Sequence, residues 1–174
     1  MTAVSVTELA AHPFLREMPD DYLTQLARLA TAITVPAGHR FFEEGGQARM
    51  LWLLTSGRVA LDLAIPGRSP LIVETLTAGD LMGISWLAPP HEWQYGAGAV
   101  EPTGAYQLDG TAVISLCDAD PRFGYQLFVR LMRVAARRLH SSRIRMLDLY
   151  AGPAGPAGPA GPAGPAGPSG PGPR

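Results

Sequence analysis

The chain has 174 residues, 47% hydrophobic and 17% charged, a composition of globular rather than disordered proteins. The formal net charge of −1 is unevenly divided, because residues 1–120 carry 14 acidic and six basic side chains whereas residues 121–174 carry one acidic and eight basic. The single cysteine, Cys117, excludes an intramolecular disulfide and a multi-cysteine metal site, and the absence of a signal-peptide core or a long apolar run predicts a cytoplasmic protein.

The first expected element is a helix that begins near Pro19-Asp20-Asp21, where the two acids suit a first turn. Its apolar residues share one face at helical spacing: Leu23, Leu26, Ala27 and Ala30. From residue 33 to residue 108, short apolar runs alternate with glycine turns about every ten residues, which predicts an antiparallel sandwich, roll or barrel. Within this region Val59, Leu61 and Leu63 alternate with Ala60 and Asp62, the pattern of a half-buried strand.

Two helices are expected after the β region. A short helix runs from Gly110 to about Cys117, and Asp120-Pro121 starts a long one that reaches about Tyr150. The long helix has one apolar stripe that can face the β core, made of Leu127, Leu131 and Val134. A second stripe follows alternating three- and four-residue spacing, the heptad pattern of a coiled coil: Tyr125, Phe128, Met132, Ala135, Leu139, Ser142, Met146 and Leu149.

We call this second stripe the seam and expect it to form a parallel homodimer, in which Ser142 is the weak point. The alternative is an ordinary core helix that packs only once, against its own β core. The seam favours the dimer because it continues beyond the first stripe, where no remaining part of the chain can cover it.

The last residues differ sharply from the rest. We expect one globular domain over residues 1–150 and a low-complexity tail over residues 151–174. Residues 152–172 form seven Gly-Pro-X triplets, where X is alanine five times, then serine, then glycine. The tail is expected to be disordered or semi-extended, like polyproline, and to add nothing to the core. The alternative is a collagen-like assembly or a recognition role.

Several motifs occur in an order that resembles the cyclic-nucleotide-binding domain of the catabolite-activator and fumarate-nitrate regulator superfamily. They span residues 12 to about 150: His12-Pro13-Phe14-Leu15, Val35-Pro36-Ala37-Gly38, Phe42-Glu43-Glu44-Gly45, residues 51–59 (LWLLTSGRV), residues 78–83 (AGDLMG) and Ala136-Arg137-Arg138-Leu139. The resemblance implies a mainly β fold, an eight-stranded antiparallel β-roll of jelly-roll type, with flanking helices and a long C-terminal dimerisation helix.

Two departures from that family limit the function. Family members that regulate transcription carry a winged helix-turn-helix after the long helix, whereas only the Gly-Pro tail follows here, so sequence-specific DNA binding is not expected. The arginines of the long helix could contact phosphates, but a solvated helix face explains them better: Arg130, Arg133, Arg137, Arg138, Arg143 and Arg145.

The second departure concerns the phosphate-binding cassette. In relatives that bind a cyclic nucleotide, a glutamate follows the cassette glycine and an Arg-Ser/Thr pair grips the phosphate. Here Ile84 follows Gly83, and Trp93 and Gln94 stand at the places of the pair. No arginine or lysine occurs between Arg68 and Arg122, so a buried phosphodiester would lack a cation and tight binding of cyclic AMP is not expected.

Aromatic residues occupy the cassette instead, since residues 85–95 contain two of the three tryptophans. The candidate ligand pocket is formed by Gly83, Ile84, Ser85, Trp86, Leu87, Trp93, Gln94 and Tyr95. One hypothesis is a neutral planar ligand stacked between rings. Another is that Trp86 and Trp93 fold inward and plug the pocket. A third, drawn from the resemblance, is haem with His91 as an axial ligand.

Catalysis is not expected, because His12, His39, His91 and His140 show no metal-binding spacing and no nucleophile or dinucleotide motif is present. We expect no cofactor. The leading hypothesis is a regulatory, sensor or adaptor dimer that acts through protein contacts or a ligand other than a cyclic nucleotide. The resemblance suggests a redox or hydrogenase-type enzyme as a partner. The alternative is a transcriptional regulator of the same family that responds to a cyclic nucleotide.

Overall fold

A computed structural model describes residues 2–151 of the chain and the side chains as far as residue 144. The chain divides into two compact units, residues 1–136 and residues 137–174. Helix α4 begins in the first unit and ends in the second. The Gly-Pro tail lies outside the described residues, so its expected conformation stays a prediction.

The first unit contains nine strands in the described part of the chain: β1 (Thr2–Ala3), β2 (Thr31–Val35), β3 (Arg40–Phe42), β4 (Met50–Ser56), β5 (Arg58–Leu63), β6 (Leu71–Thr77), β7 (Leu81–Met82), β8 (Gly96–Ala99) and β9 (Thr103–Asp109). The helices are α1 (Val6–Ala11), η1 (Pro13–Leu15), α2 (Asp20–Leu29), η2 (Ser85–Leu87), α3 (Gly110–Ala119) and α4 (Pro121–Ala151), where η marks a short 3-10 helix.

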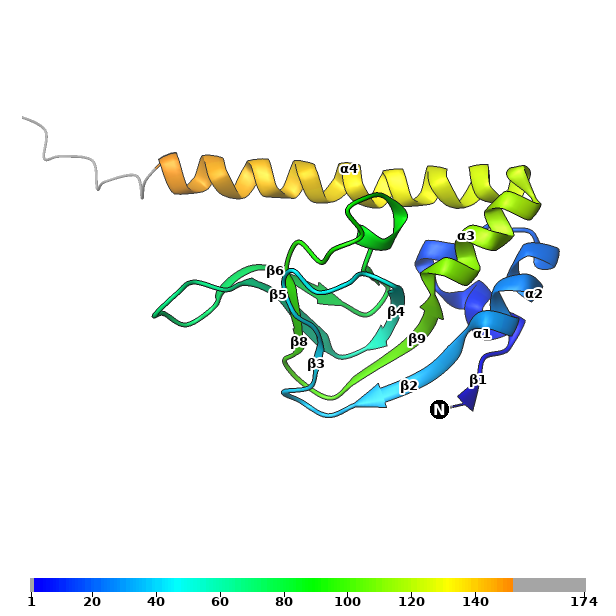
Figure 1. Cartoon of the computed structure of the whole chain (residues 1–174), viewed down its shortest axis with the longest axis horizontal. Helices are drawn as coiled ribbons and strands as arrows, with labels where there is room; N and C mark the ends of the chain where they lie inside the picture. Colours follow the sequence, from blue (N-terminus) through cyan, green and yellow to red (C-terminus); the bar gives the residue numbers. More distant parts are fainter. Residues whose placement is uncertain (1, 152–174) are drawn as a thin grey trace, which may run out of the picture. The chain divides into compact units, whose positions relative to one another are not determined.

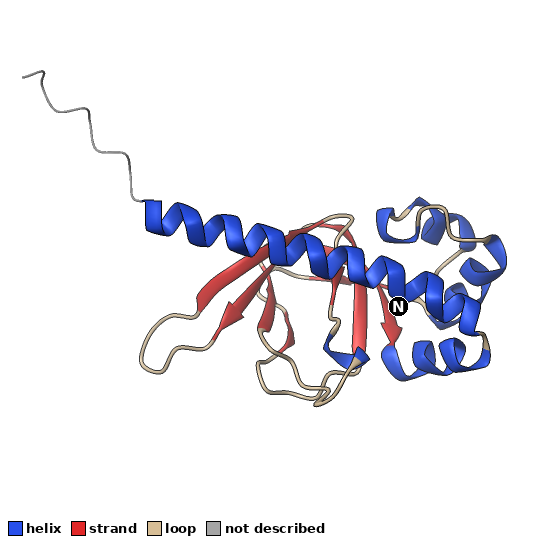
Figure 2. Ribbon diagram, turned by 90° about the horizontal axis from the view of Figure 1, so that it is seen from above, coloured by secondary structure: helices blue, strands red, loops and turns tan. Residues whose placement is uncertain are grey.

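The strands form two antiparallel sheets (Figures 1 and 2). One sheet has the order β1-β2-β9-β4-β7 and the other β3-β8-β5-β6. The predicted antiparallel β-roll with a long C-terminal helix is therefore confirmed. It has one strand more than the eight expected, because β1 pairs with β2 at the edge of the first sheet, where Thr2 lies opposite Ala32.

The two predicted helices after the roll, α3 and α4, each begin directly after an aspartate that caps the helix N-terminus. The Asp109 carboxylate accepts the backbone N–H of Ala112 at 3.1 Å and starts α3. The Asp120 carboxylate accepts the N–H groups of Arg122 and Phe123 at 2.9 and 3.2 Å and starts α4. Each aspartate thus satisfies backbone donors that have no partner inside the helix, which is why both boundaries could be predicted.

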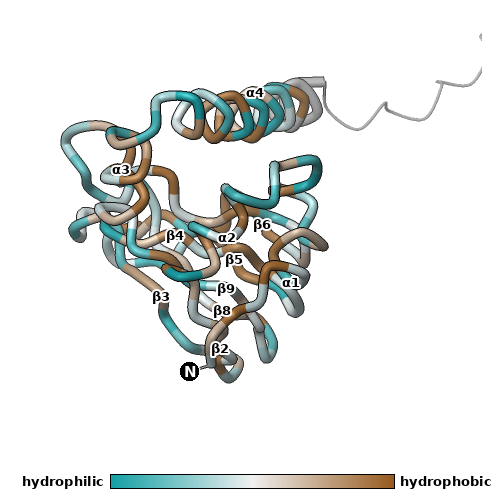
Figure 3. Tube along the Cα trace, turned by 90° about the vertical axis from the view of Figure 1, so that its right-hand side faces the viewer, coloured by the Kyte–Doolittle hydropathy of each residue, from teal (hydrophilic) through white to brown (hydrophobic). Residues whose placement is uncertain are grey.

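The hydrophobic core joins the roll to the helices of the first unit. The predicted core stripe of α4 is buried, with Leu127, Leu131 and Val134 4–6% exposed. Figure 3 shows hydrophilic and hydrophobic residues alternating around the turns of this helix. The predicted apolar face of α2 also joins the core, since Leu23 and Leu26 are buried. In the described part of the chain, no helix is long and apolar enough to cross a membrane.

Strand β5 differs from the expected half-buried strand because both of its faces are covered. Val59 and Leu61 face the core, but Asp62 on the other face is also buried, at 8% exposed. The Arg40 guanidinium lies over this outer face, where it donates to Asp62 and passes close to Gly96. Arg40 therefore covers Asp62, a position that the alternating pattern assigns to solvent.

Candidate ligand-binding site

The cassette begins at Gly83, directly after β7, and this position requires glycine. Its φ is +79°, in the left-handed region, and a Cβ there would lie 2.8 Å from the Met50 carbonyl oxygen and 3.1 Å from the Trp93 ring. The backbone then enters η2, where the Trp86 indole N–H donates to the Gly83 carbonyl at 3.0 Å. The chain thus packs tightly against Trp93 at the very residue that opens the cassette.

Trp93 points into the interior of the roll and is 6% exposed. Its ring stacks on Phe42 of β3 with a centroid distance of 3.9 Å and an interplanar angle of 17°. The ring centroid of Trp52, on β4, lies 6.0 Å from that of Trp93 and 5.5 Å from that of Phe42. Because β3 and β4 belong to different sheets, this aromatic cluster of Phe42, Trp52 and Trp93 fills the space between the two sheets.

The backbone on both sides of Trp93 is fastened to the turn between β3 and β4. The Trp93 N–H donates to the Gly46 carbonyl, and the Gly45 N–H donates to the Trp93 carbonyl, both at 2.8 Å. Two residues earlier, the His91 carbonyl accepts the Ala48 N–H at 2.7 Å. A buried indole between such paired backbone groups is held in one position, so the Trp93 side chain fills part of the interior of the roll.

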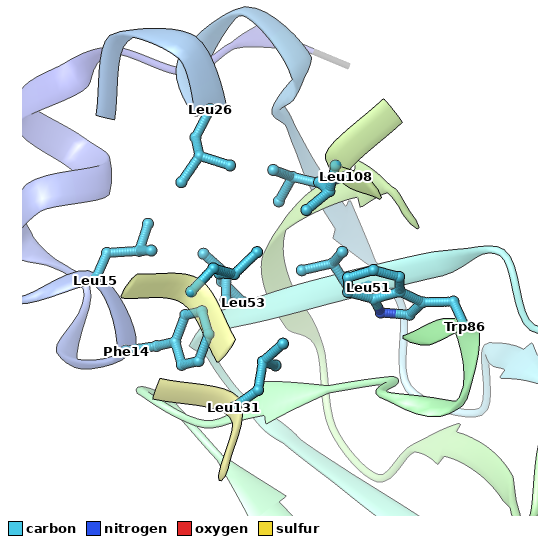
Figure 4. Close-up of a pocket in the computed structure, with 10 residues that line it drawn as sticks. Phe14, Leu15, Leu26, Leu51, Leu53, Trp86, Leu108 and Leu131 are labelled. Carbon is cyan, nitrogen blue, oxygen red and sulfur yellow. The ribbon is translucent and has the colours of Figure 1, made fainter. Parts of the chain in front are cut away.

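Trp86 lies elsewhere and does not pair with Trp93. Its ring packs over Gly110, where a Cβ would come within 2.7 Å of it, and it is 3% exposed. Figure 4 shows Trp86 with Leu51, Leu108 and Leu131 around an apolar void of about 10 Å³, room for no more than one water molecule. The two indoles are therefore packed into different parts of the core.

The remaining candidate pocket residues are not brought together with Trp93. Ile84 and Ser85 are half-buried, while Leu87, Gln94 and Tyr95 are exposed. The Gln94 side-chain amide donates at 3.3 Å to the carbonyl of Glu92, two residues earlier, rather than into the roll. Of the eight residues of the sequence-based pocket, Trp86 and Trp93 are therefore in the core, whereas Leu87, Gln94 and Tyr95 lie on the surface. The interior contact of Trp93 with Phe42 was not predicted from the sequence.

Two arginines of the roll, Arg40 and Arg58, are paired with carboxylates. Arg40 donates to Asp62 and to Glu43, and these hydrogen bonds raise the pKa of Arg40 above its ordinary value. Arg58 pairs with Glu101 at 3.0 Å. Each of these guanidiniums already has an anionic partner, so neither is free to bind the phosphate of a ligand.

The residues around His91 do not suit haem. His91 is half-buried at φ +56°, and its Nδ1 lies 2.9 Å from the Trp86 carbonyl oxygen. A haem in the interior of the roll would have to displace the aromatic cluster of Phe42, Trp52 and Trp93. No group of three potential metal ligands occurs within the described residues.

Comparison with known proteins identifies one family and many solved structures of similar fold. Residues 32–120, slightly more than half of the chain, match the model of the family described as "Cyclic nucleotide-binding domain". No curated protein matches the chain.

Three solved structures illustrate the structural similarity. A putative cyclic nucleotide-binding protein from Geobacter metallireducens is 23% identical with a TM-score of 0.71, and the match covers 79% of this chain and 99% of that one. A cyclic nucleotide-binding domain from Methylobacillus flagellatus is 19% identical with a TM-score of 0.72, covering 82% of each chain. The catabolite activator protein of Thermus thermophilus is 24% identical with a TM-score of 0.63, covering 80% of this chain and 63% of that one.

Proposed function

The chain belongs to the cyclic nucleotide-binding domain family, and from this premise we propose that it is a cytoplasmic, non-enzymatic regulatory or adaptor domain. Its ligand chamber is filled by its own side chains. It acts through protein contacts and not through a bound cyclic nucleotide.

The observation that carries this proposal is the stacking of Trp93 on Phe42 inside the roll. A cyclic nucleotide at this place would have to displace the indole. An aromatic side chain buries about 150–250 Å², so its displacement costs about 4–6 kcal/mol. That cost alone weakens binding by about a thousandfold or more, at about 1.4 kcal/mol for each factor of ten.

The phosphate adds a second cost. The segment between Arg68 and Arg122 has neither arginine nor lysine, and the neighbouring Arg40 is engaged by Asp62 and Glu43. A phosphodiester buried without a cation loses its hydration without compensation, which costs several kcal/mol. Both effects act in the same direction, against a cyclic nucleotide.

We also propose that the protein functions as a homodimer through the seam of α4. In the first unit the seam residues Tyr125, Phe128 and Met132 are 68%, 51% and 49% exposed. In the second unit Leu139 is 55% exposed and Ser142 is also exposed. Ala135 is half-buried, and Met146 and Leu149 lie beyond the described side chains. A parallel coiled coil would bury this apolar stripe against the same stripe of a second copy.

Calorimetric titration of the full chain with cyclic AMP and with cyclic GMP tests the proposed function. We expect no saturable heat up to millimolar nucleotide, because both costs oppose binding. A dissociation constant in the micromolar range would favour the alternative, a regulator that responds to a cyclic nucleotide. The matched control is a domain of this family with the Glu and Arg-Ser cassette intact, which should give a saturable isotherm under the same conditions.

A further inference from the structure

A surface groove of about 340 Å³ lies beside the end of α1 and shares no residue with the cassette. Its walls come from α1 and the following Pro13, from the end of β4, from the turn between β6 and β7, and from Tyr106 of β9. All of these residues belong to the first unit. A hollow of this size can hold a small organic molecule.

His12 lines the groove and joins the end of α1 to β4. Its Nδ1 accepts the Phe14 N–H at 3.2 Å, so Nε2 carries the proton and donates to the Leu54 carbonyl at 3.1 Å. Burial lowers the pKa of His12, which keeps the ring neutral at pH 7. Because both ring nitrogens are engaged, His12 fixes this side of the groove and adds no positive charge to it.

Thr55 reaches the groove from a bulge in β4. Leu54 lies opposite Ala105 and Ser56 lies opposite Gly104, so Thr55 is the extra residue between two consecutive positions of β9. A bulge of this kind redirects the side chain of the extra residue. Glycine at position 104 leaves room for the hydroxyl, because a Cβ there would lie 2.8 Å from Thr55 Oγ1.

The polar groups of the groove are a carboxylate and two hydroxyls. The Ser5 hydroxyl and backbone N–H both donate to Glu8 Oε2, which lowers the pKa of Glu8 and keeps it ionised. Burial, and then the nearby Glu8 carboxylate, raise the pKa of half-buried Tyr106, so its phenol stays protonated. Within the described residues, neither the Tyr106 phenol nor the Thr55 hydroxyl has a hydrogen-bond partner.

The charge of the groove selects a cation. No arginine or lysine lines it, and besides Glu8 the half-buried Asp80 lies close enough to His12 to act on it electrostatically. The remaining walls are apolar and include Ala11 and Pro13. A guanidinium suits such a site, because it is planar, carries five N–H donors and stacks on aromatic rings.

We propose that this groove binds a small organic cation in which a guanidinium is carried on a short alkyl chain. The guanidinium donates to Glu8 Oε1 and to the hydroxyl oxygens of Tyr106 and Thr55. The alkyl chain lies against Ala11 and Pro13. The site is independent of the roll interior, so it gives a domain whose cassette is filled by tryptophan a place for a different ligand.

The test is an NMR titration of the full chain with butylguanidinium. We expect saturable shifts of Glu8, Thr55 and Tyr106 with a dissociation constant in the millimolar range or tighter. Butylurea has nearly the same shape but no charge, and should bind at least about ten-fold more weakly. Butylammonium has the charge but not the planar set of donors, and should bind several-fold more weakly.

Two substitutions locate the site. Glu8→Gln removes the charge but keeps the capping box with Ser5, since glutamine also suits this position, and should weaken binding about ten-fold. Glu92→Gln, at an exposed carboxylate outside the groove, should not change it. Tyr106→Phe removes only the phenol oxygen and should weaken binding several-fold.

Four results would overturn the proposal. The first is the absence of saturable shifts at these residues up to about 20 mM butylguanidinium. The second is equal affinity for butylurea, which would remove the role of charge. The third is equal or tighter binding of butylammonium, which would remove the preference for a guanidinium. The fourth is an unchanged affinity in both Glu8→Gln and Tyr106→Phe, which would place the ligand elsewhere.

Discussion

Replacement of Trp93 by alanine should remove the occupant of the roll and leave an apolar cavity beside Phe42 and Trp52. Substitutions of a buried tryptophan by alanine cost about 3–5 kcal/mol, because they lose buried area and leave a cavity. The loss of the ring stacked at 3.9 Å places this substitution in the upper part of that range. For a domain of this size the melting temperature should fall by roughly 10 °C or more.

Free indole should partly restore the stability of Trp93→Ala, because an apolar cavity of this shape stays dry and accepts an aromatic molecule. With a dissociation constant ten-fold below the indole concentration, the gain is about 1.4 kcal/mol, or roughly 4 °C. Thermal unfolding with and without 1 mM indole measures both effects. Trp93→Phe, which keeps a ring in place, guards against a variant too unstable to study.

Tyr95→Ala is the matched control, since this aromatic residue of the same turn is 41% exposed and its loss should change stability by less than about 0.5 kcal/mol. If Trp93→Ala were no more destabilising than Tyr95→Ala, or if indole stabilised the unchanged protein to the same extent, Trp93 would not be filling the interior and the reasoning would fail.

Three further predictions concern the dimer, the N-terminal segment and the cassette glycine. Leu139→Arg places a charge in the seam and should halve the mass found by light scattering. Ile144→Arg, at an exposed residue outside the seam, should leave the mass unchanged. Equal masses for the two variants would contradict a dimer through the seam. Burial lowers the pKa of His12, whose Nε2 lies 3.1 Å from the Leu54 carbonyl oxygen, so the folded state favours the neutral ring. Stability should therefore decline as the pH falls below the ordinary histidine pKa of about 6.5, and the melting temperatures of His12→Gln at pH 7.5 and 5.5 should differ less than those of the unchanged protein. Gly83→Ala should cost at least about 2 kcal/mol by denaturant unfolding, because φ is +79° and the Cβ would lie 2.8 Å from a backbone oxygen; a cost below 1 kcal/mol would contradict the tight packing at this turn.

The parts of the fold that depend on local chemistry could be predicted from the sequence. The aspartate caps of α3 and α4 and the glycine turns of the roll act through neighbouring residues, so their patterns determine the structure directly. Helix α1 was not predicted, although Ser5 and Glu8 form a capping box that marks its start. A serine followed three residues later by a glutamate is the capping-box pattern of a helix N-terminus, so α1 could have been predicted from the sequence.

The contents of the roll could not be predicted, because they depend on contacts between distant segments. One hypothesis from the sequence is that Trp86 and Trp93 both fold inward and plug the pocket, but their separation along the chain does not determine which ring each one meets. Trp93 instead stacks on Phe42, 51 residues earlier, and its backbone pairs with the turn at Gly45 and Gly46. Likewise, Asp62 on the outer face of β5 is buried by Arg40 from another strand, and the alternation of apolar and polar residues within β5 cannot predict this contact.

The most direct test of the filled roll is fluorine NMR of the full chain with 5-fluorotryptophan at its three tryptophans, titrated with cyclic AMP. The Trp93 signal is assigned by its loss in Trp93→Phe. We predict that this signal keeps its buried position and does not move up to millimolar nucleotide. A saturable shift of the Trp93 signal toward that of exposed tryptophan at micromolar cyclic AMP would show that the indole leaves the roll for a ligand, and would contradict the account.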